Sequence, residues 1–263
     1  MIFPYQHELE TLKPLVREAG NRVLELSRTG FHVHRKSDRS PVTTADLEVN
    51  RYLKEQLLQI YPDDGWLSEE EPDDHTRLTK SRVWIVDPLD GTKYFIAGVP
   101  QFAISIALVE NAEPVVAVIF NPATNEFFSA VQRQGAFLDG SPVHVRTETP
   151  HSITLLVNPP ALHRGLFRNM DSAVTCQPMG SIAYTLALIA SGRADGTINV
   201  ARQNEWDLAA GTLLVHEAGG QVMDRYGHPL RFNQRTPFVR GVIATRPDLA
   251  SRLLDLAKRL FSK

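Results

Sequence analysis

The hydrophobic positions of the first 60 residues repeat with helical spacing. Residues 6 to 28 place apolar side chains at alternating intervals of three and four, with charged residues between them, which predicts an amphipathic helix. Residues 31 to 42 are mostly polar and predict an extended arm or a hairpin. We expect a second helix to begin at Thr43 or Thr44, either of which could cap it, and to end before Pro62.

An apolar, β-branched run at residues 83 to 86 predicts a buried strand. Pro88 has no N–H to donate to a central ladder, so the strand is expected to break directly after Asp87. Residues 90 to 92 are then expected to open a short helix, whose free N–H groups would face whatever the carboxylates hold.

The rest of the first half alternates short apolar runs with turn residues, which predicts an antiparallel meander. Its expected strands are residues 102 to 109, 114 to 120, 126 to 131 and 136 to 138. The second half alternates strands and helices. Its expected strands are 153 to 157, 195 to 200 and 222 to 224, and its helices lie near 181 to 191, from 204 onward and from Thr245 onward.

No low-complexity linker separates these segments. We therefore expect one compact catalytic unit in which an N-terminal α+β half, residues 1 to 150, carries most of the metal ligands, and a C-terminal α/β half, residues 151 to 263, packs against it.

Composition and charge exclude several classes of protein. The chain has 263 residues, 43% hydrophobic and 22% charged, which is typical of a globular protein. Its net charge of −2 gives no basic excess for a nucleic acid polymer or an anionic membrane. The single cysteine, Cys176, excludes internal disulfides and fits a reducing compartment. With no apparent leader and no run of about 18 apolar residues, a cytoplasmic location is predicted.

The most informative stretch is Asp87-Pro-Leu-Asp90-Gly, which could also be ordinary turn chemistry. An EF-hand loop counted from Asp87 would have Leu89 at its third position and Gly98 at its twelfth, so the stretch is not an EF-hand. The Asp-x-Asp spacing of phosphatases that attack with an aspartate is also missing, because the residue two before Asp90 is Pro88. A covalent aspartyl-phosphate is therefore not predicted.

Five acidic residues form the candidate constellation: Glu69, Glu70, Asp87, Asp90 and, in the second half, Asp207. If they converge, their repulsion raises their pKa values unless cations neutralise them. Carboxylates without neighbouring His or Cys favour magnesium or manganese over zinc. Two such ions could hold a phosphate ester and activate a water, so no covalent nucleophile is needed.

Four motifs in this order resemble the inositol monophosphatase family of magnesium-dependent, lithium-sensitive phosphatases. They are Leu67-Ser-Glu-Glu70, Asp87-Pro-Leu-Asp-Gly-Thr92, Trp206-Asp-Leu-Ala-Ala-Gly211 and Glu217-Ala-Gly-Gly220. The resemblance covers roughly residues 35 to 225. It implies an α/β (α+β) fold, a layered α-β-α-β-α sandwich, and commonly a homodimer.

The resemblance also implies roles for residues at matching positions. Glu69, Asp87 and the Leu89 carbonyl would hold a first Mg²⁺, and Asp87, Asp90 and Asp207 a second. Asp46 matches the acidic position near a third, more weakly bound ion.

The catalytic residues implied by the family are Glu70, Thr92 and Asp90, with Glu70 and Thr92 orienting the attacking water. Gly91, Thr92, Lys93 and Asp207 would bind the substrate, the first two through N–H groups that cradle the phosphate.

Two branches of the family predict different substrates for this chain. The first predicted substrate is a small inositol-like phosphate ester. Lys93 after Gly-Thr instead resembles the branch that hydrolyses 3′-phosphoadenosine 5′-phosphate, for which Tyr94 could stack on adenine. The inositol branch usually has Glu seven residues before the metal Asp, where this chain has Val200, a departure that counts against inositol. Arg202 and Gln203 could contact the alcohol half of the substrate, although an exposed loop is the simpler expectation.

A third hypothesis, from another class, is a non-catalytic sensor of metal and phosphate. Glu70 and Thr92 count against it, because a protein that only binds would not need them.

Overall fold

The computed structural model describes residues 4 to 147, 152 to 168 and 170 to 261. The helices are α1 (Gln6–Thr29), α2 (Thr44–Ile60), α3 (Thr92–Ile96), α4 (Pro159–His163), α5 (Ile182–Ala190), α6 (Glu205–Glu217) and α7 (Ala250–Phe261), with 3-10 turns η1 (Thr76–Thr79) and η2 (Pro247–Leu249). The strands are β1 (Val33–Arg35), β2 (Pro41–Thr43), β3 (Gly65–Ser68), β4 (Arg82–Asp90), β5 (Ala103–Glu110), β6 (Glu113–Asn121), β7 (Glu126–Val131), β8 (Ala136–Leu138), β9 (Ser141–Val143), β10 (Ile153–Val157), β11 (Val174–Pro178), β12 (Gly196–Asn204), β13 (Gln221–Asp224) and β14 (Phe238–Thr245).

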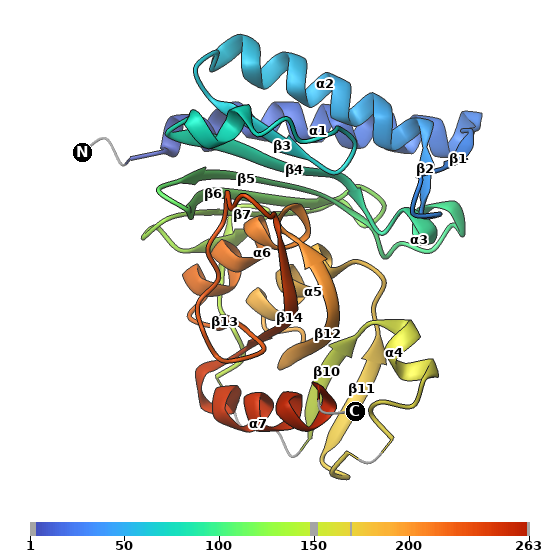
Figure 1. Ribbon diagram of the computed structural model, residues 1–263, viewed down its shortest axis with the longest axis vertical. Coiled ribbons are helices and arrows are strands. Elements are labelled where there is room, and N and C mark those ends of the chain that lie inside the picture. Colours follow the sequence, from blue (N-terminus) through green and yellow to red (C-terminus); the bar gives the residue numbers. More distant parts are fainter. Residues whose placement is uncertain (1–3, 148–151, 169, 262–263) are drawn as a thin grey trace.

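Five layers alternate through the molecule (Figure 1). Helices α1 and α2 cover one face of a seven-stranded sheet with the order β3-β4-β5-β6-β7-β8-β9. Helices α5 and α6 lie between it and a five-stranded sheet with the order β11-β10-β12-β14-β13, and α7 covers the far side of that second sheet. The predicted α-β-α-β-α sandwich is confirmed.

Strand β4 shows why an uninterrupted apolar run is needed at the centre of this sandwich. Val83 and Ile85 face the core shared with α5 and α6, while Trp84 and Val86 face the core under α1 and α2. Because alternate side chains of a strand point to opposite faces, a sheet covered on both sides requires apolar residues at every position.

The prediction that this strand breaks directly after Asp87 was wrong. The ladder to β5 pairs Asp87 with Ser105, slips by one residue, and pairs again at Asp90 with Ala103. The slip is a β-bulge, which accommodates Pro88 without ending the strand and bends the chain locally. Strand β4 therefore bends at the bulge and continues to Asp90, where the sequence predicted that it would end.

The other elements that were predicted for the first half are present, and β3, η1 and β9 are additional to them. Strands β1 and β2 form the hairpin, and Thr43 caps α2 by accepting a hydrogen bond from the N–H of Ala45. The meander is β5 to β8, extended by β9.

The second half departs further from expectation. Strand β12 runs to Asn204 and not to Val200, and Thr245, where the last helix was expected to begin, is the end of an unpredicted strand, β14. Strand β11 and helix α4 were also unpredicted. The proposed boundary between halves, at residues 150 and 151, lies outside the described residues. Within the described ranges, no helix is long and apolar enough to cross a membrane.

Candidate active site

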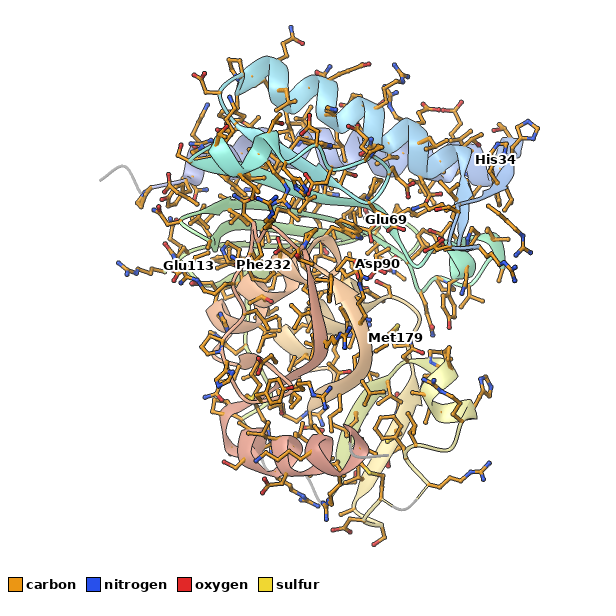
Figure 2. All side chains as sticks on the ribbon, viewed as in Figure 1. His34, Glu69, Asp90, Glu113, Met179 and Phe232 are labelled. Atoms are coloured by element: carbon orange, nitrogen blue, oxygen red, sulfur yellow. The ribbon has the colours of Figure 1, made fainter. Side chains whose placement is uncertain are left out.

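Three of the predicted acids, each from a different element, converge. Glu69 directly follows β3, Asp87 lies at the bulge of β4, and Asp207 lies in the first turn of α6. One carboxylate oxygen from each lies within 4.8 Å of the others. In Figure 2, Glu69, Asp90 and Met179 follow one another from top to bottom near the middle of the view, from the seven-stranded sheet into the C-terminal half.

Asp87 is a buried acid with too few hydrogen-bond partners for its two carboxylate oxygens. It is 1% exposed, its Oδ1 accepts a hydrogen bond from the N–H of Leu89 at 2.9 Å, and its buried Oδ2 has no partner among the described residues. Burial, then the negative charges of Glu69, Asp90 and Asp207, raise the pKa of Asp87 well above its ordinary value. Such a group is costly unless a cation compensates it.

The pKa of Asp207 is raised for the same reasons, first by burial and then by the charges of Asp90 and Glu69. Its Oδ2 accepts a hydrogen bond from the backbone N–H of Asn204 at 2.8 Å, which fixes the carboxylate against the helix start. Three clustered carboxylates with an unpartnered oxygen fit a hard divalent cation such as Mg²⁺ or Mn²⁺.

Asp90 is held by the C-terminal half. Its Oδ2 accepts hydrogen bonds from the Ser181 hydroxyl at 2.5 Å and from the Ala183 N–H at 2.7 Å, at the start of α5. Burial raises the pKa of Asp90 to about 6, against the opposing effect of the Ser181 hydrogen bond. Gly91 follows with a φ of +95°, and a Cβ there would lie 2.6 Å from the carbonyl oxygen of Gln101. Only glycine fits this turn.

Thr92 and Asp46 are in direct contact. The Thr92 hydroxyl lies 2.9 Å from Asp46 Oδ1 and 3.1 Å from the Leu89 carbonyl oxygen, and its single proton can go to only one of them at a time. Asp46 Oδ2 accepts from both the N–H and the hydroxyl of Thr43. The helix cap of α2 therefore orients Asp46, and Asp46 orients Thr92.

Glu70 has a basic partner that the sequence did not reveal. Lys36, from the β1–β2 hairpin, donates to Glu69 at 2.7 Å and to Glu70 at 2.8 Å. Burial of Lys36 would lower its pKa, but the charge of Glu69 and hydrogen bonds to both glutamates raise it above the ordinary value. Burial raises the pKa of Glu70 to about 7, partly offset by Lys36. Sequence spacing carries no signal for a contact that depends on how the hairpin docks.

A cavity of about 180 Å³ opens beside Asp90 and Asp207. Its walls are mainly amides and hydroxyls from the C-terminal half. They include Asn158, Thr185, Thr197, Asn199 and Gln203.

Val200, at the position where the inositol branch usually has Glu, does not line the cavity. Adjacent side chains of strand β12 point to opposite faces, so Asn199 lines the cavity together with Thr197, while the partly buried Val200 packs against the core beneath α7. Gln203 lines the cavity and lies on a strand, not in the exposed loop that was the simpler expectation. Arg202 is exposed, with its guanidinium 3.7 Å from the centre of the Phe238 ring, and does not line the cavity.

A family model described as the inositol monophosphatase family matches residues 5 to 260. The chain belongs to the inositol monophosphatase family. The predicted family and the predicted class, a phosphoric monoester hydrolase, are therefore confirmed.

Relatives from two branches of this family align over most of the chain. An inositol monophosphatase of Mesembryanthemum crystallinum is 36% identical over 229 residues, 80% of this chain and 84% of that protein. The 3′(2′),5′-bisphosphate nucleotidase CysQ of Aggregatibacter actinomycetemcomitans is 31% identical over 244 residues, 89% of this chain and 90% of that protein. The solved IMPase of Thermotoga maritima has a TM-score of 0.88 and 26% identity, covering 98% of this chain and 99% of that one.

The two residues that suggested the nucleotidase branch of the inositol monophosphatase family lie differently. Lys93 is exposed and does not line the cavity. Tyr94 packs against Gly180, which does line it: a Cβ on Gly180 would lie 2.2 Å from the Tyr94 ring. The aromatic ring therefore lies against the cavity wall.

Proposed function

We propose that this protein is a Mg²⁺-dependent phosphomonoesterase that hydrolyses a small phosphate ester by direct attack of water. The observation that carries the proposal is the convergence of Glu69, Asp87 and Asp207 at the edge of a polar cavity, where one buried oxygen of Asp87 has no partner among the described residues.

The predicted ligands divide over two main positions. Glu69, Asp87 and the Leu89 carbonyl would hold one Mg²⁺, and Asp87, Asp90 and Asp207 a second. When bound, these ions would neutralise the phosphate charge and lower the pKa of the attacking water. Asp46 was expected near a third ion, and its hydrogen bond to Thr92 gives it a further role that needs no ion.

Glu70 and Thr92 would handle the attacking water. Glu70 is shielded from solvent and has a pKa near neutrality, which suits a group that accepts a proton. Thr92 can accept a hydrogen bond from the water while its own proton is held by Asp46 or Leu89. The N–H groups of Gly91 and Thr92 would contact the phosphate oxygens.

The cavity supports an inositol-like alcohol as the leaving group. The amides and hydroxyls that line it can donate to and accept from several hydroxyl groups, and among the described residues its charged side chains are the predicted ligands Asp90 and Asp207. Phosphate release with Mg²⁺ should be compared for inositol 1-phosphate, fructose 1,6-bisphosphate and 3′-phosphoadenosine 5′-phosphate at equal concentrations. Preference for inositol 1-phosphate is the expected result.

A second substrate has one observation in its favour. The Tyr94 ring against the cavity wall could stack on adenine, as in a 3′(2′),5′-bisphosphate nucleotidase such as the CysQ relative. A strong preference for the nucleotide in the same assay would replace the inositol-like assignment and make Tyr94 a specificity residue. Release from none of the three esters would favour a non-catalytic sensor of metal and phosphate.

Family membership also supports lithium inhibition and a homodimer, which inhibition at millimolar lithium and light scattering would test. The single cysteine supports a cytoplasmic location, which fractionation would test.

A further inference from the structure

A buried arginine and a buried glutamate, neither part of the catalytic set, hold the same short turn. Arg77, on η1, has a side chain with no exposed surface, and Glu205, the first residue of α6, is 1% exposed. Between them lie Asn233 and Gln234, in the connection from β13 to β14. Arg77 comes from the first half of the chain, and the other three residues come from the second.

The turn is held from both sides by hydrogen bonds. Glu205 accepts the Asn233 N–H at 2.6 Å on one carboxylate oxygen and the Gln234 N–H at 2.9 Å on the other. Arg77 donates to the Asn233 side-chain oxygen at 2.5 Å and to the Gln234 carbonyl oxygen at 2.9 Å. We call these four residues the clamp.

Each end of the clamp is joined to a segment that carries predicted ligands. Glu205 is two residues before Asp207, in the same first turn of α6. Arg77 makes a two-pronged contact with Asp73, three residues after Glu70, at 3.1 and 2.7 Å. A Cβ on Gly65, at the start of β3, would lie 3.1 Å from the Arg77 backbone, so Arg77 also abuts the strand that delivers Glu69.

The turn itself is anchored on the seven-stranded sheet. Phe232, which precedes it, is fully buried and donates its N–H to the Ala112 carbonyl oxygen at 3.0 Å, between β5 and β6. Figure 2 shows Phe232 beside Glu113, at the junction of the two halves. The clamp therefore has a rigid base and links the Glu69 segment to the Asp207 segment across that junction.

We propose that Arg77 and Glu205 are positioning residues for the metal site, which set the distance between Glu69 and Asp207 by gripping the Asn233–Gln234 turn. The proposal rests on the proposed assignment of Glu69 and Asp207 as ligands. Partners that orient metal ligands typically change metal affinity about 10- to 100-fold when they are substituted. A purely structural pair would change only the stability of the fold.

The direct test is binding of Mg²⁺ alone to the full-length protein, measured by isothermal titration calorimetry, with the Tm in EDTA recorded for each variant. Arg77→Lys keeps the positive charge but loses the planar guanidinium, whose N–H groups contact several acceptors at once. Glu205→Gln keeps the shape of the side chain but replaces one acceptor oxygen by an NH₂ group. We expect roughly 10-fold or greater weakening of Mg²⁺ binding in both. Asn233→Ala, which removes only one contact of Arg77, gives a milder variant if the others do not fold, and a smaller weakening is expected.

Arg246→Lys is the matched control. Arg246 is also buried and paired with acids, but its partners Asp195 and Asp248 lie in segments without predicted ligands. It should lower the Tm and leave Mg²⁺ affinity unchanged. Wild-type affinity in the folded clamp variants would overturn the proposal. Unchanged Mg²⁺ binding in Asp207→Asn would instead show that the ligand assignment is wrong, so the two failures can be told apart.

Discussion

The proposed metal site and the clamp both contain buried carboxylates, but the two differ in how many hydrogen-bond partners the carboxylate oxygens have. Glu205 in the clamp has a hydrogen bond on each oxygen, whereas Asp87 at the metal site has a buried oxygen with no partner among the described residues. Burial raises the pKa of both groups, to about 7 for Glu205 and well above the ordinary value for Asp87. A satisfied buried acid fixes the backbone around it, and an unsatisfied one leaves a place for a ligand.

The largest expected effect comes from removing the unsatisfied charge. Asp87→Asn should abolish phosphate release, because Asp87 is shared by both predicted ion positions. It should also raise the Tm in EDTA by about 2–4 °C for each kcal/mol of relieved repulsion. Exposed Asp63→Asn is the control, with neither change expected. A lower Tm in EDTA for Asp87→Asn would contradict the contrast between the two sites.

Glu70→Gln should reduce turnover by about 10²–10⁴-fold, because the amide cannot accept the proton of the attacking water. Mg²⁺ affinity should change little, since Glu70 is not among the predicted ligands. The neighbouring Glu71, which pairs with Lys54 and Asn50, provides the matched control Glu71→Gln, with near wild-type turnover expected. Unchanged turnover in Glu70→Gln would remove Glu70 from the catalytic set.

Stability without metal should fall as pH rises. The pKa values of Glu70, about 7, and Asp90, about 6, lie above those of the unfolded chain, so the folded state binds more protons between about pH 4 and 7. The free energy of unfolding therefore decreases through this range in EDTA. Mg²⁺ should remove most of the decrease, so the Tm increase on adding Mg²⁺ grows from pH 5 to pH 8. A constant increase across that range in thermal melts would argue against convergence of the ionised acids at the ion positions.

The smallest expected effect is on the KM, from a cavity residue that would contact the alcohol half of the substrate. Asn199→Ala should raise the KM for inositol 1-phosphate by roughly 2- to 10-fold, the value of one hydrogen bond, with kcat nearly unchanged. Val200→Ala is its neighbour on the opposite face of β12 and should lower only the Tm. An equal KM shift in both variants would mean that the two faces of β12 do not separate their roles.

Local patterns allowed strand β4 and the first-half acids to be predicted, whereas the layered sandwich was predicted from the family resemblance. Asp87 and Asp90 lie in one short motif, and residues 83 to 86 form a run that is apolar at every position and is buried on both faces. Asn199 was not found, because the sequence does not report which face of β12 borders the cavity beside Asp90 and Asp207. Strand β14 was missed because Arg240 and Gly241 interrupt its apolar run.

Contacts between residues that are distant in the sequence could not be predicted either. Lys36 reaches Glu69 and Glu70, and Arg77 reaches Asn233, only after segments distant in the chain have docked. No spacing rule along one sequence reports such a contact. The sequence therefore did not identify Lys36 and Arg77 as residues near the site, because each is an ordinary charged residue in the chain.

The contact of Lys36 with both glutamates has a consequence for how the protein takes up its ions. The ammonium group already acts as a counterion of the site, because it contacts one oxygen of Glu69 and one of Glu70. A divalent ion that binds Glu69 therefore enters a site that already holds one positive charge, and not a bare acidic hollow. Added salt should weaken its binding less than it would weaken attraction to the full set of carboxylates, because the net negative charge of the site is smaller.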